Sequence, residues 1–103
     1  MNILVVDDDL ADLLRDFFED EGHAVVTTTD GDQALRRLAE STFDLVITDV
    51  FHPGPKGPEI AREALNRGLR TIMVSAAPIV DCPDGAVCLP KPIAFRDVLA
   101  LLD

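Results

Sequence analysis

Short apolar runs alternate along the chain with longer stretches in which apolar residues recur every three to four positions. The short runs are rich in β-branched residues and have the length of buried strands; they lie at 2–6, 24–27, 45–48, 70–74 and 87–89. The longer stretches place their apolar residues on one helical stripe; they lie at 10–18, 34–39, 58–65 and 95–102. This alternation predicts a parallel sheet with helices on both faces.

Several residues at the ends of the predicted helices support these boundaries. Asp9 is expected to cap the first helix, and Gly22 to end it. Pro58 suits the first position of the third helix, and Gly68 follows that helix as a stop. The segment 76–86 differs, because it contains two prolines and a glycine and has no helical stripe. We therefore expect the helix between the fourth and fifth strands to be missing or reduced to a turn.

Composition and charge narrow the function classes. The 103 residues are 48% hydrophobic and 27% charged, which fits one globular domain spanning 1–103. The formal net charge of −10 argues against a nucleic-acid partner, because phosphate binding needs a basic surface. No apolar run approaches the length of a membrane span, so we expect no membrane partner. The first apolar run does not follow a basic segment, so we expect no signal peptide. Cys82 and Cys88 are too few for a disulfide framework and predict inert thiols in a reduced, cytoplasmic protein.

Polar side chains follow four of the predicted strands at the point where each strand ends. Asp7 and Asp8 follow the first strand, Asp49 the third, Ser75 the fourth and Lys91 the fifth. In an open parallel sheet, ligands bind at the carboxyl ends of the strands. Carboxylates suit Mg²⁺, which keeps open positions for phosphate oxygens, and a carboxylate can also accept a phosphoryl group as nucleophile.

Four segments together resemble the receiver domain of two-component response regulators, the CheY-like superfamily. They are ILVVDDD (3–9), ITDVFHPGPKG (47–57), IMVSA (72–76) and LPKPI (89–93). The resemblance covers essentially the whole chain. It implies a flavodoxin-like, doubly wound α/β fold with a five-stranded sheet of strand order 2-1-3-4-5.

The resemblance also implies a role for each residue of the magnesium site. Asp8 and Asp49 would ligate Mg²⁺ through their side chains, and Phe51 would do so through its backbone carbonyl. Asp7 would act through a metal-bound water. Mg²⁺ is thus the expected cofactor.

The phosphoryl group itself is expected on Asp49, the phosphoacceptor implied by the resemblance. Ser75 would be the switch hydroxyl, and Lys91 would contact the phosphoryl group and precede a cis peptide to Pro92. Neither Phe51 nor Ala77 offers a side-chain hydrogen bond to a hydrolytic water, which predicts slow self-dephosphorylation.

Two features depart from the receiver pattern. The short spacing from Ser75 to Lys91 leaves little room for the fourth helix. Receivers usually carry an aromatic residue three positions before the lysine, where this chain has Cys88. The usual aromatic switch is therefore absent, and we expect the segment 76–86 to order or shift instead.

The function predicted from these motifs is a stand-alone phosphoacceptor that is not an enzyme with a substrate of its own. Its expected partners are a histidine kinase or histidine phosphotransfer protein and a downstream protein target, with the chain a monomer or weak dimer. The alternative is a receiver-fold interaction module that is never phosphorylated. A hydrolase with an aspartate nucleophile is disfavoured, because Phe51 stands where such enzymes carry a second aspartate. A flavin-binding module is disfavoured because the acidic run after the first strand would repel a flavin phosphate.

Overall fold

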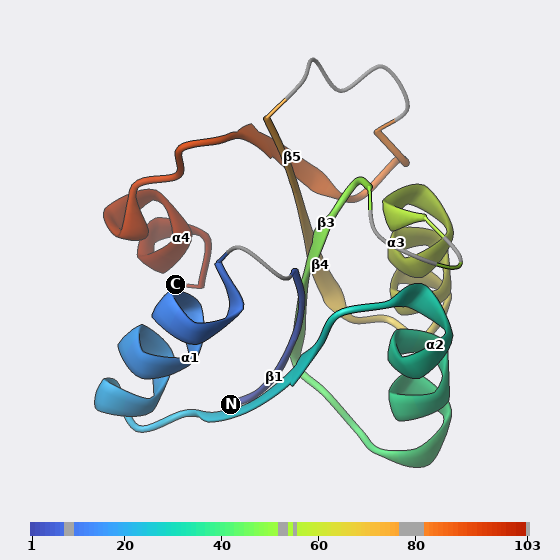
Figure 1. The fold of residues 1–103 in the computed structure, drawn as a ribbon, viewed down its shortest axis with the longest axis horizontal. Coiled ribbons are helices and arrows are strands. Elements are labelled where there is room, and N and C mark those ends of the chain that lie inside the picture. Colours follow the sequence, from blue (N-terminus) through green and yellow to red (C-terminus); the bar gives the residue numbers. More distant parts are fainter. Residues whose placement is uncertain (8–9, 52–53, 55, 77–81, 103) are drawn as a thin grey trace.

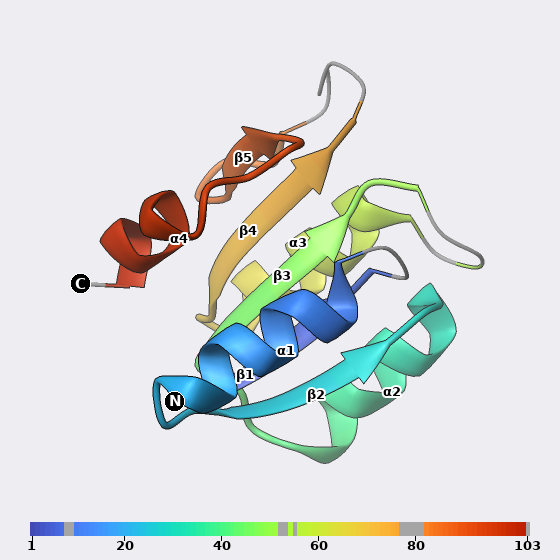
Figure 2. The same ribbon diagram turned by 60° about the vertical axis from the view of Figure 1, so that its left-hand side comes forward.

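The computed structural model describes residues 1–7, 10–51, 54, 56–76 and 82–102, with the side chains of 95, 101 and 102 left aside. Its centre is a five-stranded parallel sheet of order β2-β1-β3-β4-β5 (Figures 1 and 2). The strands are β1 (Asn2–Val6), β2 (Ala24–Thr28), β3 (Leu45–Asp49), β4 (Arg70–Ser75) and β5 (Val87–Pro90). The predicted strand order is confirmed.

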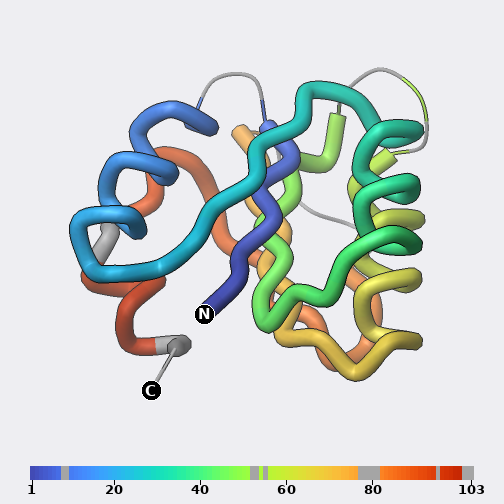
Figure 3. The backbone as a smooth tube through the Cα atoms, turned by 90° about the horizontal axis from the view of Figure 1, so that it is seen from below, coloured from blue at the N-terminus to red at the C-terminus, as the bar shows by residue number. Residues whose placement is uncertain are grey.

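Four helices in the described residues cover the two faces of the sheet. They are α1 (Ala11–Asp20), α2 (Gly31–Glu40), α3 (Gly57–Asn66) and α4 (Phe95–Leu102). Helices α1 and α4 lie on one face, and α2 and α3 lie on the other (Figures 1 and 2). Figure 3 shows the sheet running between these two helical layers. The predicted flavodoxin-like, doubly wound fold is therefore confirmed. No helix among the described residues has the length and apolarity needed to cross a membrane.

The core is divided by the sheet into two clusters, because alternate residues of a strand face opposite sides. Val5 and Ile47 belong to the cluster under α1 and α4, whereas Leu4 and Val46 belong to the cluster under α2 and α3. All four are fully buried, as is Phe18 of α1. The central strands are thus apolar on both faces, which explains their continuous apolar runs in the sequence.

The start of α1 differs from the prediction. The N-cap residue is Leu10 and not Asp9, whose own placement lies outside the described residues. The Leu10 backbone N–H donates to Oδ1 of Asp7 at 3.2 Å, so a carboxylate of the candidate site serves the first turn of α1. The start of α2 follows the common rule, because Asp30 is the N-cap and accepts from the Gln33 N–H. Pro58 lies at the second position of α3, one residue further into the helix than predicted, because the helix begins at Gly57.

The connection between β4 and β5 contains no helix in its described residues, 76 and 82–86. A turn at Asp84 and Gly85 is closed by a hydrogen bond from the Ala86 N–H to the Pro83 carbonyl. The prediction of free cysteines is wrong, because Cys82 and Cys88 form a disulfide. The turn folds the chain back until their Cα atoms are 6.3 Å apart, a separation that a disulfide bridges and that sequence spacing did not reveal.

Candidate functional site

The candidate site lies at the carboxyl ends of β1, β3, β4 and β5. These strands are parallel neighbours in the sheet, so the residues that end them meet at one edge. Asp7 follows β1, Asp49 ends β3, Ser75 ends β4 and Lys91 follows β5. The site therefore gathers residues that are far apart in the sequence.

Among the described charged residues of the site, Asp7 is the most deeply buried. Its side chain has no exposed surface, and its Oδ2 lies 3.0 Å from Nζ of Lys91. Its Oδ1 accepts from the Leu10 N–H, and its backbone N–H donates to the Thr28 carbonyl. Both carboxylate oxygens are thus held, one by the first turn of α1 and the other by the site lysine.

Asp49 sits beside Asp7 at the end of the central strand β3. Its side chain is 13% exposed, so it is open to the solvent at one edge. Oδ1 accepts from the Phe51 backbone N–H at 2.9 Å, and Oδ2 lies 3.7 Å from Nζ of Lys91. The loop that follows β3 therefore fixes the orientation of this carboxylate and leaves Oδ2 directed to the lysine.

Lys91 connects the two carboxylates. Its single ammonium lies within 4 Å of Asp7 and Asp49, and its side chain is only 16% exposed. The Lys91 N–H donates to the Ser75 carbonyl at 2.8 Å, which joins the end of β5 to β4. The Lys91–Pro92 peptide is cis, as predicted.

Ser75 lies one residue further along β4 than the partner of Asp49, which is Val74. It is 3% exposed and pairs with Pro90 of β5. The hydroxyl is therefore carried at the same edge as the carboxylates and the lysine. The structure brings together the side chains of Asp7, Asp49 and Lys91, and it places Ser75 at the same edge of the sheet.

The remaining predicted features are less completely described. Asp8 and Ala77 lie outside the described residues, as do the loop residues His52, Ile79 and Val80. Phe51 is described and is 66% exposed; its carbonyl as a ligand stays a prediction. Within the described ranges no group of three or more His, Cys, Asp or Glu residues could hold a metal ion.

The charges of the described site suit a small divalent cation. Two buried carboxylates share one ammonium, which leaves an excess negative charge in a region of low exposure. Like charges at such a position repel each other, and a hard cation bound by oxygen atoms would remove this repulsion. The residues present therefore fit Mg²⁺, with Asp7 and Asp49 as the described carboxylates.

Gly57 makes a close backbone contact with the end of β3 that the sequence did not predict. A Cβ atom at this position would clash with the Asp49 carbonyl oxygen and would lie 2.7 Å from the Val50 Cα. The Gly57 N–H donates to the Val50 carbonyl at 2.9 Å. Glycine thus lets the start of α3 lie directly against the end of β3. The sequence shows a glycine after Lys56, but nothing in the spacing indicates this contact.

The comparisons with known proteins agree with this geometry. The family model of the response regulator receiver domain matches residues 3–103. Transcriptional regulatory protein CutR of Streptomyces coelicolor is 32% identical over 110 residues, covering 97% of this chain and 51% of CutR. Transcriptional regulatory protein ResD of Bacillus subtilis is 34% identical over 77 residues, covering 73% of this chain and 32% of ResD. The chain thus spans about half or less of the length of these curated relatives.

Solved structures give the same result. Response regulator TrrA of Thermotoga maritima, in complex with Mg²⁺–BeF, has a TM-score of 0.81 and 28% identity, with 98% of this chain and 95% of that chain covered. A CheY-like receiver domain protein of Methanospirillum hungatei has a TM-score of 0.86 and 27% identity, with 98% and 89% covered. The family match over nearly the whole chain, the strand order and the site at the sheet edge lead to one conclusion: this chain belongs to the response regulator receiver domains of two-component systems.

Proposed function

We propose that residues 1–103 form a phosphoacceptor domain in which Asp49 takes a phosphoryl group from a phosphohistidine donor in the presence of Mg²⁺. The observation that carries this proposal is the convergence of two buried carboxylates, Asp7 and Asp49, on the single ammonium of Lys91. A purely structural role would be served by one carboxylate paired with the lysine. The second carboxylate adds a negative charge that a bound cation would neutralise. It also supplies an oxygen nucleophile that could accept a phosphoryl group.

In the proposed transfer, an oxygen of Asp49 attacks phosphorus, the P–N bond to the donor imidazole breaks, and the imidazole leaves and takes up a proton. Mg²⁺ held by Asp8, Asp49 and the Phe51 carbonyl, with Asp7 acting through water, would neutralise phosphoryl oxygens. Lys91, now 3.0 Å from Asp7, would turn its ammonium to the phosphoryl group.

The remaining contact comes from the neighbouring strand. Ser75, which lies at the same edge, would donate its hydroxyl to another phosphoryl oxygen. Slow self-dephosphorylation is expected, because Phe51 presents an exposed apolar ring beside Asp49 and no group that could activate water.

The proposed partners are a histidine kinase or histidine phosphotransfer protein as donor and a downstream protein as target. We propose a cytoplasmic location and a monomer or weak dimer. The domain itself is proposed to act without direct nucleic-acid contact, since its net charge is −10. Its curated relatives are named transcriptional regulatory proteins and are about twice as long or longer, so this applies to residues 1–103 alone.

A receiver-fold module that is never phosphorylated is the second candidate. It is favoured by Cys88, which stands where an aromatic switch residue is expected, and by the lack of a helix in the described part of the β4–β5 connection. In that case the protein would signal by binding alone, and the charged edge would have no phosphoryl group to hold.

The two candidates are separated by treating the protein with acetyl phosphate and Mg²⁺ and measuring the intact mass. The wild type is expected to gain one phosphoryl group, and Asp49→Asn is expected to gain none. Asp20→Asn, at an exposed aspartate of α1, is the matched control and should behave as the wild type. Failure of the wild type to gain mass with either acetyl phosphate or a phosphohistidine donor would favour the binding module.

A further inference from the structure

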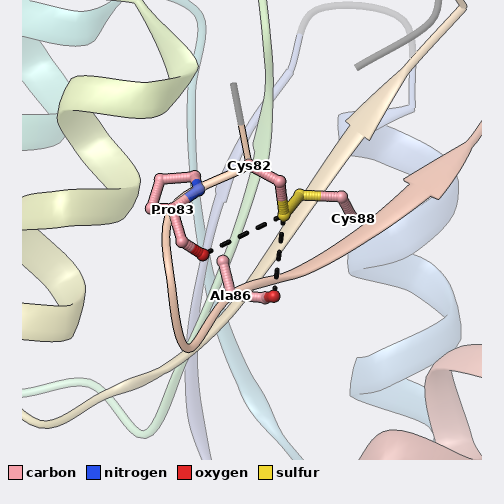
Figure 4. Close-up of a disulfide and its surroundings, with 4 residues drawn as sticks. All are labelled: Cys82, Pro83, Ala86 and Cys88. Carbon is pink, nitrogen blue, oxygen red and sulfur yellow. Dashed lines mark hydrogen bonds between the residues drawn. A yellow bond between two sulfur atoms is a disulfide. The ribbon is translucent and has the colours of Figure 1, made fainter. Parts of the chain in front are cut away.

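The disulfide between Cys82 and Cys88 closes a short turn that leads into β5 (Figure 4). Cys82 is exposed, whereas Cys88 is half-buried within the strand. Cys88 pairs in register with Met73 of β4, which is fully buried. The bond therefore joins a solvent-accessible position to the ordered edge of the sheet.

This turn covers the α3 side of the sheet edge. Leu89 packs against the core cluster under α1 and α4, so its neighbour Cys88 faces the opposite side, where α3 lies. A Cβ at Gly85 would lie 3.3 Å from Leu65 of α3, and Pro83 is buried. The turn therefore packs against α3. It belongs to the connection between β4 and β5, whose described residues contain no helix.

Few hydrogen bonds hold this turn among the described residues 82–86. Within the described residues 82–86, a backbone hydrogen bond runs from the Ala86 N–H to the Pro83 carbonyl, at 3.1 Å. Sγ of Cys82 lies 3.7 Å from the Ala86 carbonyl oxygen and 4.0 Å from that of Pro83 (Figure 4). A disulfide sulfur carries no hydrogen, so these contacts become possible hydrogen bonds only for the reduced thiol. In the oxidised state the disulfide is therefore the covalent restraint on this turn.

We propose that Cys82–Cys88 is a reversible redox site. Its oxidised form holds the turn 82–86 against α3 at the start of β5, and its reduced form releases that turn. The co-reactant is a dithiol. One of its thiolates attacks the sulfur of Cys82, the more exposed residue of the pair, the S–S bond breaks, and Cys88 leaves as a thiolate that takes up a proton. The second thiolate of the dithiol then attacks the mixed disulfide and releases Cys82. Two electrons pass to the protein, and the reductant leaves as a disulfide.

Two further observations support a reversible role over a permanent one. Exposed disulfides are generally the more easily reduced ones, and Cys82 is exposed. Disulfides in a reducing cytoplasm are usually transient or redox-sensing, an argument that rests on the cytoplasmic location proposed above. Cys88 also lies three positions before Lys91, so the strand that the disulfide anchors carries the lysine of the phosphoryl site.

The test combines thiol counting with amide hydrogen exchange on the folded protein, without any phosphodonor. Air-oxidised protein is expected to show no alkylatable thiol under native conditions, and two after dithiothreitol treatment. Reduction should speed exchange in the peptide containing the Ala86 amide by about tenfold or more, because the closed turn then opens more often. Exchange in α1, on the opposite face of the sheet, should not change.

The double variant Cys82→Ser, Cys88→Ser is the matched control. Its turn should exchange at the rate of the reduced wild type and should not respond to dithiothreitol. The proposal is overturned if the air-oxidised protein keeps two free thiols, if the bond is reduced only under denaturing conditions, or if reduction leaves exchange in the turn unchanged. None of these readouts depends on Asp49, so failure here is distinguishable from failure of the proposed phosphoryl chemistry.

Discussion

Replacing Lys91 with methionine is the most direct test of the charge balance at the sheet edge. Methionine keeps an unbranched side chain of similar length and removes the ammonium. That ammonium lies 3.0 Å from Oδ2 of Asp7 and 3.7 Å from Oδ2 of Asp49. In the Lys91→Met variant both carboxylates would lose the cation they share, and Asp7 has no exposed surface through which water could replace it.

The expected cost follows from this burial. Removing one partner of a buried ion pair destabilises a protein by about 3–5 kcal/mol, because the remaining charge is left uncompensated. The Lys91 and Asp49 side chains keep 16% and 13% exposure, so water can offset part of the loss. We therefore expect the free energy of unfolding in EDTA to fall by about 2–4 kcal/mol. For a domain of this size, that corresponds to a decrease in Tm of about 10–20 °C.

Urea denaturation in EDTA and in saturating Mg²⁺ measures this effect. Mg²⁺ should stabilise the variant more than the wild type, because the bound cation supplies the missing positive charge and no longer competes with Lys91 for Asp7. The gap in stability should therefore narrow when Mg²⁺ is added. Arg36→Met, which removes an exposed cation from α2, is the matched control and should change stability by less than about 0.5 kcal/mol.

Two results would refute this reasoning. Equal stability of the Lys91→Met variant and the wild type in EDTA would show that Asp7 and Asp49 do not depend on the lysine for compensation. A gap that stays constant or widens with Mg²⁺ would show that the cation does not occupy the same charged edge. Either result would also weaken the proposed phosphoryl site.

Two other substitutions test local features of the fold. Gly57→Ala should destabilise the protein by about 1–3 kcal/mol in urea and weaken Mg²⁺ stabilisation, because the new Cβ would press on the backbone of Asp49 and Val50. A variant as stable as the wild type would mean that this contact relaxes at no cost. Asp30→Ala should lower the free energy of unfolding by about 1 kcal/mol, since the Gln33 N–H loses its 2.8 Å acceptor. The Mg²⁺ response of Asp30→Ala should stay as in the wild type, and a changed response would contradict a purely local role.

Local sequence carried much of the fold. The apolar runs at 2–6, 45–48 and 70–74 predicted buried strands, because a strand covered on both faces must be apolar at successive positions. The apolar residues from Leu10 to Phe18 predicted α1, because their spacing places them on one face of a helix. The residues that end the strands were also correctly predicted to share one edge, since parallel neighbours end on the same side of a sheet.

The start of α1 shows where local rules reach their limit. A capping aspartate was expected at position 9, yet the first turn bonds to Asp7, which the fold places behind it. The choice between neighbouring carboxylates depends on where strand β1 directs the chain, and that direction is a property of the packed sheet. Gly57 is a similar case. A side chain is excluded there because the start of α3 lies against the end of β3.

By itself, the sequence determined the order of strands and helices, the candidate residues and their place at the strand ends. These depend on periodicity and on residue chemistry, which act within a few positions of the chain. The tertiary structure alone decided that one ammonium lies between Asp7 and Asp49 and that Cys82 meets Cys88. Such contacts join separate segments at distances of a few ångströms, and packing, not spacing along the chain, brings those segments together.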